Sequence, residues 1–255
     1  MKLSRSEVLS LMKNDKYPLS SKYDPDWIIE NALGSHCLWL MEALAQIIPL
    51  KPSMRVLDIG CGKAISSIFL AKEFGVKVWA TDLRANPTEN FQRIHDARVE
   101  DMVFPVRADA HNLPYADSYF DAIVGINSLQ LFAQGGNYLR ENLVRHVKPG
   151  GSIGMVVPGI YREFNDGIPE YLQLHVAAFL DDFKTWHSPE WWREHFARAG
   201  NTDIELIDAF PDGEGNMLYG KSSRIDRSDD EDSFYNDDNG RNITFVRILV
   251  RRKEL

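Results

Sequence analysis

The feature that most constrains this chain is a short apolar run that ends in a glycine-rich turn, SMRVLDIGCGKA at residues 53–64. Its apolar part, residues 56–59, is typical of a strand that is buried on both faces of a parallel sheet. Gly60 and Gly62 follow at once, and glycine lets a backbone approach a ligand where a side chain would obstruct it. A helix that begins at about residue 63 would direct free N–H groups into the same space. The run therefore predicts a nucleotide-type ligand site at the carboxyl end of the first strand.

Strands and helices are predicted to alternate after this run. The expected strands cover residues 54–59, 76–81, 103–107, 120–126, 152–157, 203–208 and 242–250. The expected helices between them cover residues 63–74, 86–96, 134–147 and 189–199. Helices of this length between strands imply right-handed crossovers and a doubly wound sheet. The chain is therefore expected to form one α/β domain, with a mostly parallel seven-stranded sheet whose last strand is antiparallel.

Two segments lie outside this alternation. Residues 1–50 are predicted to form a helical N-terminal cap, with a helix over 4–16 and a second over about 26–47 for which a break at Gly34 is left open. Residues 158–189 are predicted to be an inserted helical segment. Aromatic residues are concentrated in these two segments: Tyr17, Tyr23, Trp27, Trp39, Tyr161, Phe164 and Trp186. Their rings could hold an apolar or cationic small molecule, with core packing as the alternative.

Composition and charge exclude several classes of protein. The net charge of −8 argues against nucleic acid as a partner. Residues 226–238 carry much of that charge, and we expect them to be a solvated acidic loop in a C-terminal part that spans 190–255, with a metal or cationic partner as the alternative. Cys37 and Cys61 do not make a metal set, so no metal is expected. The absence of a secretory or membrane-spanning apolar run predicts a cytoplasmic protein without a membrane partner.

Three aspartates lie in or just after the first three predicted strands: Asp58, Asp82 and Asp109. Ligands of doubly wound sheets bind outside the carboxyl ends of the strands, so Asp82 and Asp109 should lie around one crevice. Asp82 stands 20 residues after Gly62, a spacing at which an acid reaches the ribose hydroxyls of an adenosine-containing ligand. Ile65 occupies the third glycine position of a dinucleotide turn. An adenosine cofactor without a pyrophosphate is therefore favoured.

Four sequence stretches occur in the order and spacing of a known family: VLDIGCGKA, ATDL, ADAHNLPYADSYFDAIVGINSL and VKPGGSIGMVVPG. They resemble the successive motifs of class I S-adenosylmethionine-dependent methyltransferases of the small-molecule type. The resemblance covers residues 54–157 and implies a Rossmann-like methyltransferase fold. It also implies S-adenosyl-L-methionine as the cofactor and a small-molecule methyl acceptor as the partner, with a homodimer left open.

The resemblance implies eight cofactor-binding residues: Asp58, Gly60, Gly62, Asp82, Leu83, Asp109, Ala110 and Asn127. Asp82 would hold both ribose hydroxyls, and Asp109 would accept a hydrogen bond from the adenine amine. Asn127 would face the methionine part and the methyl acceptor. For Asp58 and Asp109 the alternatives are a structural acid and a turn cap.

Methyl transfer from a sulfonium is a direct displacement, so the protein mainly has to align the acceptor and exclude water. A general base is needed only for a protonated acceptor. His36 and His187 are the candidate catalytic residues, whereas His111 is expected to be structural or solvent-facing. The alternative function is a non-catalytic S-adenosylmethionine-binding regulatory or partner subunit. A polyamine synthase of the same fold would need more acids around its acceptor.

Overall fold

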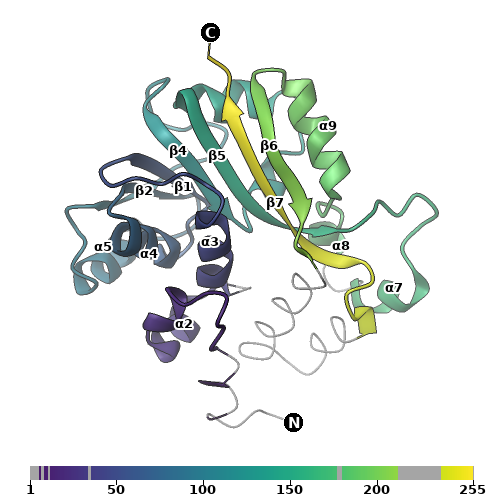
Figure 1. The fold of residues 1–255 in the computed structure, drawn as a ribbon, viewed down its shortest axis with the longest axis horizontal. Helices are drawn as coiled ribbons and strands as arrows, with labels where there is room; N and C mark the ends of the chain where they lie inside the picture. The colour runs from purple at the N-terminus through teal and green to yellow at the C-terminus, as the bar shows by residue number, and fades with distance from the viewer. Residues whose placement is uncertain are drawn as a thin grey trace.

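A seven-stranded sheet forms the centre of the molecule, with the strand order β3-β2-β1-β4-β5-β7-β6 (Figure 1). The computed structural model describes residues 6, 9–10, 12–33, 36–176, 180–211 and 237–254. The strands are β1 (Arg55–Ile59), β2 (Lys77–Asp82), β3 (Val103–Arg107), β4 (Phe120–Ile126), β5 (Val147–Ile160), β6 (Thr202–Ala209) and β7 (Ile243–Arg252). The first five pair in parallel, and β7 lies antiparallel between β5 and β6. The predicted sheet with its antiparallel last strand is confirmed.

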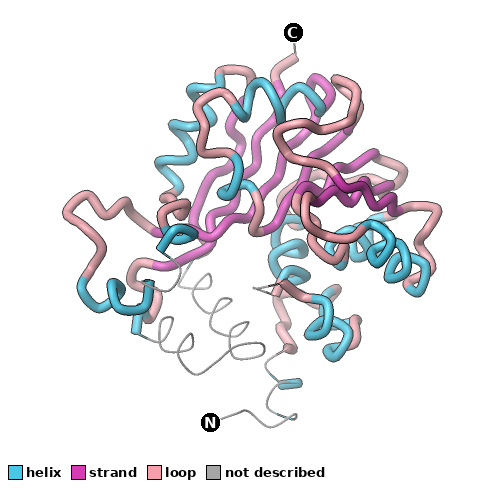
Figure 2. The backbone as a smooth tube through the Cα atoms, turned by 180° about the vertical axis from the view of Figure 1, so that it is seen from behind, coloured by secondary structure: helices cyan, strands magenta, loops and turns pink. Residues whose placement is uncertain are grey.

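Helices cover both faces of this sheet, as the view from behind also shows (Figure 2). The α-helices are α2 (Pro25–Asn31), α3 (Cys37–Ala45), α4 (Ile65–Phe74), α5 (Pro87–Asp96), α6 (Leu129–Phe132), α7 (Glu170–Val176), α8 (Leu180–Phe183) and α9 (Pro189–Ala199). One hydrophobic cluster joins α3, α4 and α5 to the sheet, and a second joins α6 and α9 to the opposite face. Val56 and Leu57 follow one another in β1 and belong to different clusters, because successive residues of a strand point to opposite faces of the sheet. This two-sided burial explains the continuous apolar run in β1.

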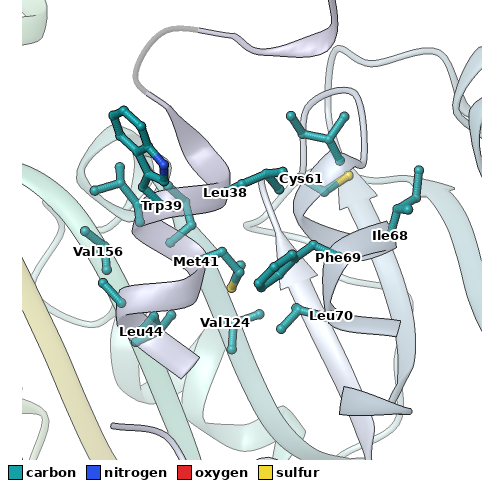
Figure 3. Close-up of a cluster of buried hydrophobic side chains, with 14 of the residues drawn as sticks. Leu38, Trp39, Met41, Leu44, Cys61, Ile68, Phe69, Leu70, Val124 and Val156 are labelled. Atoms are coloured by element: carbon teal, nitrogen blue, oxygen red, sulfur yellow. The ribbon is translucent and has the colours of Figure 1, made fainter. Parts of the chain in front are cut away.

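The N-terminal cap is packed into the first of these clusters. Figure 3 shows Met41 and Leu44 of α3 beside Phe69 and Leu70 of α4, gathered over Val124 of β4. All five side chains are at most 1% exposed. The cap is thus part of the core, and it is fixed next to the helix that follows the glycine-rich turn.

Several helix ends lie where the sequence carries a capping signal. The side chain of Asn86 accepts a hydrogen bond from the N–H of Thr88 at the start of α5, and Ser188 does the same for Trp191 in α9. Gly75 and Gly200 end α4 and α9 in the left-handed conformation that glycine favours. These signals explain why the boundaries of α4, α5 and α9 lie close to the predicted ones.

The predicted helix over residues 134–147 is met in part, because helical turns are present only from residue 138 to residue 146. The chain forms the short helix α6 earlier, at 129–132, and then a π-helical turn at Leu139–Leu143 and a 3₁₀ turn at Val144–His146. The physical reason is the pair Gly135 and Gly136, which disfavours a continuous helix. Strand β5 also begins at Val147 and is longer than predicted, because an irregularity in its pairing with β4 accommodates the proline and glycines that follow.

The predictions for the terminal parts are met in part. The helix expected over 26–47 is two helices, α2 and α3, separated by a stretch in which the described residues 32, 33 and 36 are not helical, whereas Gly34 itself lies outside the described residues. Of the helix expected over 4–16, residues 6, 9 and 10 are helical and residues 12–16 are turn and coil, whereas the others lie outside the described residues. Among the described residues, no helix has both the length and the apolar character that a membrane crossing requires.

Of the acidic run 226–238, the structure describes Asp237 and Asp238. Asp238 departs from the expected solvated loop. Its side chain is fully buried. The carboxylate accepts hydrogen bonds from the Tyr171 hydroxyl and from the N–H groups of Asn242 and Ile243. Asp238 therefore joins α7 to the start of β7.

A buried carboxylate attaches the start of the described chain to α3. Glu42 is 2% exposed and accepts hydrogen bonds from the N–H of Leu19 at 2.9 Å and the N–H of Ser20 at 2.6 Å. The Ser20 hydroxyl lies 2.5 Å from the same carboxylate. Buried polar groups of this kind are costly to leave without a partner.

Replacing this carboxylate should weaken the fold. Glu42→Ala leaves two buried N–H groups without acceptors, and we expect the free energy of unfolding to fall by about 2–4 kcal/mol. Urea unfolding measures this loss. The control is Glu194→Ala, which removes a carboxylate that is 63% exposed and should cost less than about 0.5 kcal/mol. Equal effects of the two substitutions would contradict the role assigned to Glu42.

Candidate functional site

A cavity of about 580 Å³ lies at the carboxyl ends of the first four strands. Ile59, Asp82, Ala108 and Ile126 line it, and each is the last residue of a strand or the first after one. Small-molecule sites usually have volumes of about 300–1,000 Å³. The cavity therefore has the position and the size of a ligand site in a doubly wound sheet.

The structure brings together most of the residues that the sequence predicted for a cofactor. The predicted residues that line the cavity are Gly60, Gly62, Asp82, Leu83, Asp109, Ala110 and Asn127. Asp58 does not line it. The roles of these residues toward a ligand stay predictions, but their common location is a property of the fold.

The glycine-rich turn passes close to the segment that follows β4. Gly60 has a φ of 74°, and a Cβ atom there would lie 2.3 Å from Cβ of Ser128, so no larger residue fits without a shift. The N–H groups of Gly60 and Cys61 both donate to the carbonyl of Thr81 at the end of β2. Ala64 directly precedes helix α4, has a φ of 62° and offers no side-chain cap. The N–H groups in the first turn of α4 are therefore not capped by this residue and are left for other partners.

Asp82 has three backbone partners. Its Oδ2 accepts a hydrogen bond from the N–H of Gly62 at 3.0 Å. Its Oδ1 accepts from the N–H groups of Arg84 at 2.7 Å and Ala85 at 2.9 Å. A carboxylate has about four lone-pair positions. Two positions on Oδ1 and one on Oδ2 are thus used within the protein, and one position on Oδ2 remains.

Asp58 lies behind the glycine-rich turn and is 1% exposed. Its Oδ2 accepts hydrogen bonds from the hydroxyls of Ser66 at 2.7 Å and Ser67 at 2.6 Å, both in the first turn of α4. Burial raises the pKa of Asp58 to about 6, although the two serine hydroxyls oppose this shift. The contacts are those of the structural alternative for this acid, with two serine hydroxyls as its partners.

Asp109 and His111 form a pair on the cavity wall. Oδ1 of Asp109 accepts from the N–H of His111 at 2.9 Å and lies 3.1 Å from Nδ1 of its ring. The hydrogen bond from this backbone N–H, followed by that from the ring, lowers the pKa of Asp109. His111 also meets the Tyr138 ring edge-on, with 5.1 Å between ring centroids. His111 therefore lines the cavity, and its side chain is 56% exposed, which agrees with the solvent-facing role that the sequence suggested.

Asn127 follows β4 in a left-handed conformation, with a φ of 54°. Its N–H donates to the carbonyl of Val156, whereas its buried Oδ1 has no hydrogen-bond partner within the described part of the chain. An asparagine with positive φ is uncommon and often marks a functional position. Asn127 thus lines the cavity and holds a buried acceptor oxygen that the described part of the protein does not use.

The sequence interpretation missed several lining residues. Asn31, Leu33 and Cys37 come from the N-terminal cap, and Leu131 and Phe132 come from α6. The exposed fractions of Leu33 and Leu131 are 59% and 60%, so two large apolar side chains remain at the surface beside the cavity. The sequence did not indicate Leu131 and Phe132 because the helix after β4 was predicted to begin at residue 134, whereas α6 covers Leu129–Phe132.

The two candidate catalytic histidines lie outside the set of residues that line the cavity. His36 begins α3 and stacks on Trp39, with 3.9 Å between ring centroids, and burial lowers its pKa to about 3. His187 stacks on Trp191 and approaches Glu163, and burial lowers its pKa as well.

The aromatic residues of the two extra segments are also absent from the cavity lining. Trp39 is fully buried in the core, and Tyr23 stacks on Trp27 with 5.9 Å between centroids. Phe164 stacks on Phe183 within the inserted segment. For these side chains the contacts are those of core packing, the alternative that the sequence left open.

A chain of hydrogen bonds connects the cap to the glycine-rich turn. The Asn90 side chain donates to the carbonyl of Gly62 at 2.9 Å. Arg93 donates to Oδ1 of Asn90 at 2.9 Å and to Oδ1 of Asn31 at 2.8 Å. In addition, Lys63 donates to the carbonyl of Glu30 at 2.8 Å. Helix α2 is therefore attached to the turn through α5, on the side where Leu33 lines the cavity.

Comparison with known proteins identifies related sequences. A family model described as a methyltransferase domain matches residues 56–151. Methyltransferase GfsG of Streptomyces halstedii is 32% identical over 208 residues, which cover 80% of this chain and 72% of that protein. The 27-O-demethylrifamycin SV methyltransferase of Amycolatopsis mediterranei (strain S699) is 32% identical over 117 residues, but this chain spans only 43% of its length.

Solved structures show the same fold at lower sequence identity. The geranyl diphosphate C-methyltransferase of Streptomyces coelicolor A3(2), in complex with Mg²⁺, geranyl diphosphate and S-adenosyl-L-homocysteine, superposes with a TM-score of 0.69. It is 17% identical, and the match covers 84% of this chain and 78% of that one. At this identity the likeness concerns the fold.

The buried carboxyl of Asp58 predicts a pH-dependent stability. Because the pKa of Asp58 is about 6 in the folded protein and 3.8 for an ordinary aspartate, folding favours the protonated form. This contribution is present below about pH 4 and is lost as the pH rises through 6, at a cost of about 2–3 kcal/mol. Asp58→Asn keeps an oxygen for the serines and removes the titration. Relative to the wild type, the variant should therefore gain stability between pH 4 and pH 7.

Urea unfolding at a series of pH values measures this difference. Asp181→Asn, at a side chain that is 98% exposed, is the matched control and should follow the wild type at every pH. Parallel curves for Asp58→Asn and the wild type would contradict the raised pKa.

Proposed function

The chain belongs to the S-adenosylmethionine-dependent methyltransferases, and we propose that it transfers a methyl group to a small-molecule acceptor held in the cavity at the carboxyl ends of its strands. The observation that carries this proposal is that the glycine-rich turn, Asp82 and Asp109 line one cavity. In this proposal residues 54–157 bind the cofactor. Residues 1–50 and 158–189 shape the acceptor side of a single domain.

The residues of the cavity fit the cofactor of this family, S-adenosyl-L-methionine. Asp82 has one lone-pair position left for a ribose hydroxyl, and Leu83, which is 51% exposed, offers an apolar surface to the base. Asp109 and the backbone of Ala110 lie on the wall where the adenine edge is expected. Gly60 and Gly62 would leave room for the methionine part. When bound, the cofactor supplies a methyl group on a positively charged sulfur, which a nucleophile displaces directly.

The chain's own residues orient the acceptor and exclude water in this proposal. Leu33, Leu131 and Phe132 would cover the acceptor with apolar surface. His111 is an imidazole on the cavity wall, and Asp109 beside Nδ1 favours the tautomer with the proton on that nitrogen. Nε2 of His111 would then be the atom able to take a proton from a protonated acceptor.

Asp82 provides the most specific test of the cofactor site. In Asp82→Asn the remaining oxygen can satisfy the N–H groups of Arg84 and Ala85, but an amide NH₂ then faces the Gly62 N–H and the ligand. We expect the affinity for S-adenosylhomocysteine to fall about 10-fold to 100-fold in a calorimetric titration. The control Asp117→Asn changes an exposed carboxylate paired with Arg145 and should bind as the wild type does.

A methyl-transfer assay distinguishes the proposed enzyme from a non-catalytic subunit that only binds the cofactor. The wild type is incubated with S-adenosylmethionine and a panel of phenols, alcohols, amines and thiols, and the formation of S-adenosylhomocysteine is measured. Acceptor-dependent product is the expected result. Binding of the cofactor without product from any acceptor would favour the non-catalytic alternative, and the absence of binding would reject the whole proposal.

A further inference from the structure

Arg93 of α5 joins two carboxamides that belong to different parts of the site. Its Nε donates to Oδ1 of Asn31 at 2.8 Å, and its Nη1 donates to Oδ1 of Asn90 at 2.9 Å. Asn31 ends α2 and lines the cavity, whereas Asn90 lies in α5. The side chain of Arg93 is 22% exposed, and Asn31 and Asn90 are 7% and 3% exposed. The guanidinium therefore forms a mostly buried bridge between the N-terminal cap and α5.

Both amides of this bridge have a fixed orientation. Nδ2 of Asn31 donates to the carbonyl of Trp27 at 2.9 Å, and Nδ2 of Asn90 donates to the carbonyl of Gly62 at 2.9 Å. Because both side-chain oxygens accept from Arg93, a flipped amide would place its NH₂ group against a guanidinium donor. The planar fork of arginine supplies donors in two directions, which the single ammonium group of a lysine does not. The bridge thus ends on the glycine-rich turn, at the carbonyl of Gly62.

The cap segment that this bridge holds forms a wall of the cavity beside Gly62. Leu33 follows Asn31 by two residues, and both line the cavity. A Cβ atom on Gly62 would lie 3.0 Å from Cδ1 of Leu33, so the leucine lies directly against the glycine-rich turn. A helix of seven residues, the length of α2, is too short to be stable by itself. The position of this wall therefore depends on tertiary contacts such as the Arg93 bridge.

Other elements build the opposite part of the cavity. Leu83 follows β2, and Asp109 and Ala110 follow β3, where the proposed function expects the adenine. The bridge ends instead on Gly62 and on the cap, at the turn that would hold the methionine part of the cofactor. Loss of the bridge should therefore act on one half of the cofactor and spare the other.

We propose that Arg93 is a positioning residue for cofactor binding. Through Asn31 and Asn90 it holds the wall that carries Leu33 against the glycine-rich turn, and so pre-organises the half of the cavity that takes the amino-acid part of the cofactor. A wall that is already in place costs less ordering when the ligand binds. Arg93 itself does not line the cavity, so it acts through its two partners. This inference rests on the proposed function, because it concerns how the proposed cofactor is bound.

The test compares two ligands that share the adenosine part. S-adenosylhomocysteine carries the amino-acid part, whereas 5′-methylthioadenosine has only a methyl group on its sulfur. Calorimetry measures the dissociation constant of the first ligand directly and that of the second by displacement of the first. Arg93→Met keeps the apolar stem and removes the donors. It should weaken the binding of S-adenosylhomocysteine about tenfold, because the released wall must be ordered when this ligand binds, and leave the affinity for 5′-methylthioadenosine unchanged.

A conservative variant and a matched control make the test specific. Arg93→Lys keeps the charge but has one ammonium group for two amides, so its loss of affinity for S-adenosylhomocysteine should be smaller and equally selective. This variant carries the test if Arg93→Met does not fold. Arg198→Met changes an arginine of α9 that is 59% exposed and should bind both ligands as the wild type does.

Three outcomes would count against these assignments. Unchanged binding of S-adenosylhomocysteine in the Arg93 variants would overturn the inference. Equal losses for the two ligands would also overturn it, since general loosening of the site weakens both. Failure of the wild type to bind S-adenosylhomocysteine would instead reject the proposed function itself.

Discussion

The end of β2 holds the glycine-rich turn in place, and the rest of the site depends on this contact. The carbonyl of Thr81 accepts from the N–H groups of Gly60 and Cys61, and Oδ2 of Asp82 accepts from that of Gly62. Three successive N–H groups of the turn are thus bound to two neighbouring residues. The turn is therefore shaped before any ligand arrives, and the same carboxylate that shapes it keeps one lone-pair position for a hydroxyl. Asp82 is in this way both a structural residue and a candidate binding residue.

The segments outside the common fold reach the cavity by two routes. The N-terminal cap is attached through Asn31 and Arg93 to Asn90, which bonds the carbonyl of Gly62. The inserted segment is attached through His187 and Gln134 to the turn after β4. Each route ends beside the cavity, on Gly62 or on the turn after β4, so hydrogen bonds connect the N-terminal cap and the inserted segment to the residues around the cavity.

The sequence predicted the sheet, its antiparallel last strand and most of the cofactor wall, because strand periodicity, glycine caps and the spacing of Asp82 and Asp109 are local signals. It did not predict α6, since Gly135 and Gly136 interrupt a helix whose apolar pattern continues on either side. Aromatic residues of the cap and of the inserted segment were the expected acceptor contacts, yet Leu33 and Leu131 line the cavity instead, and the three-dimensional fold decides which loops meet there. The motif indicated that Asp58 lies beside the glycine-rich turn. Its two serine partners could be found only from the structure, because they depend on how α4 packs on β1.

The most direct test of the account is a crystal structure of the protein with S-adenosylhomocysteine. The account predicts a ribose hydroxyl on Oδ2 of Asp82, the adenine edge beside Asp109 and Ala110, and the methionine part over Gly60 and Gly62. It also predicts that the sulfur faces Asn127, with the space next to Leu131 and Phe132 left for the acceptor. A ligand bound elsewhere, or one in this cavity without contact to Asp82, would contradict the central claim.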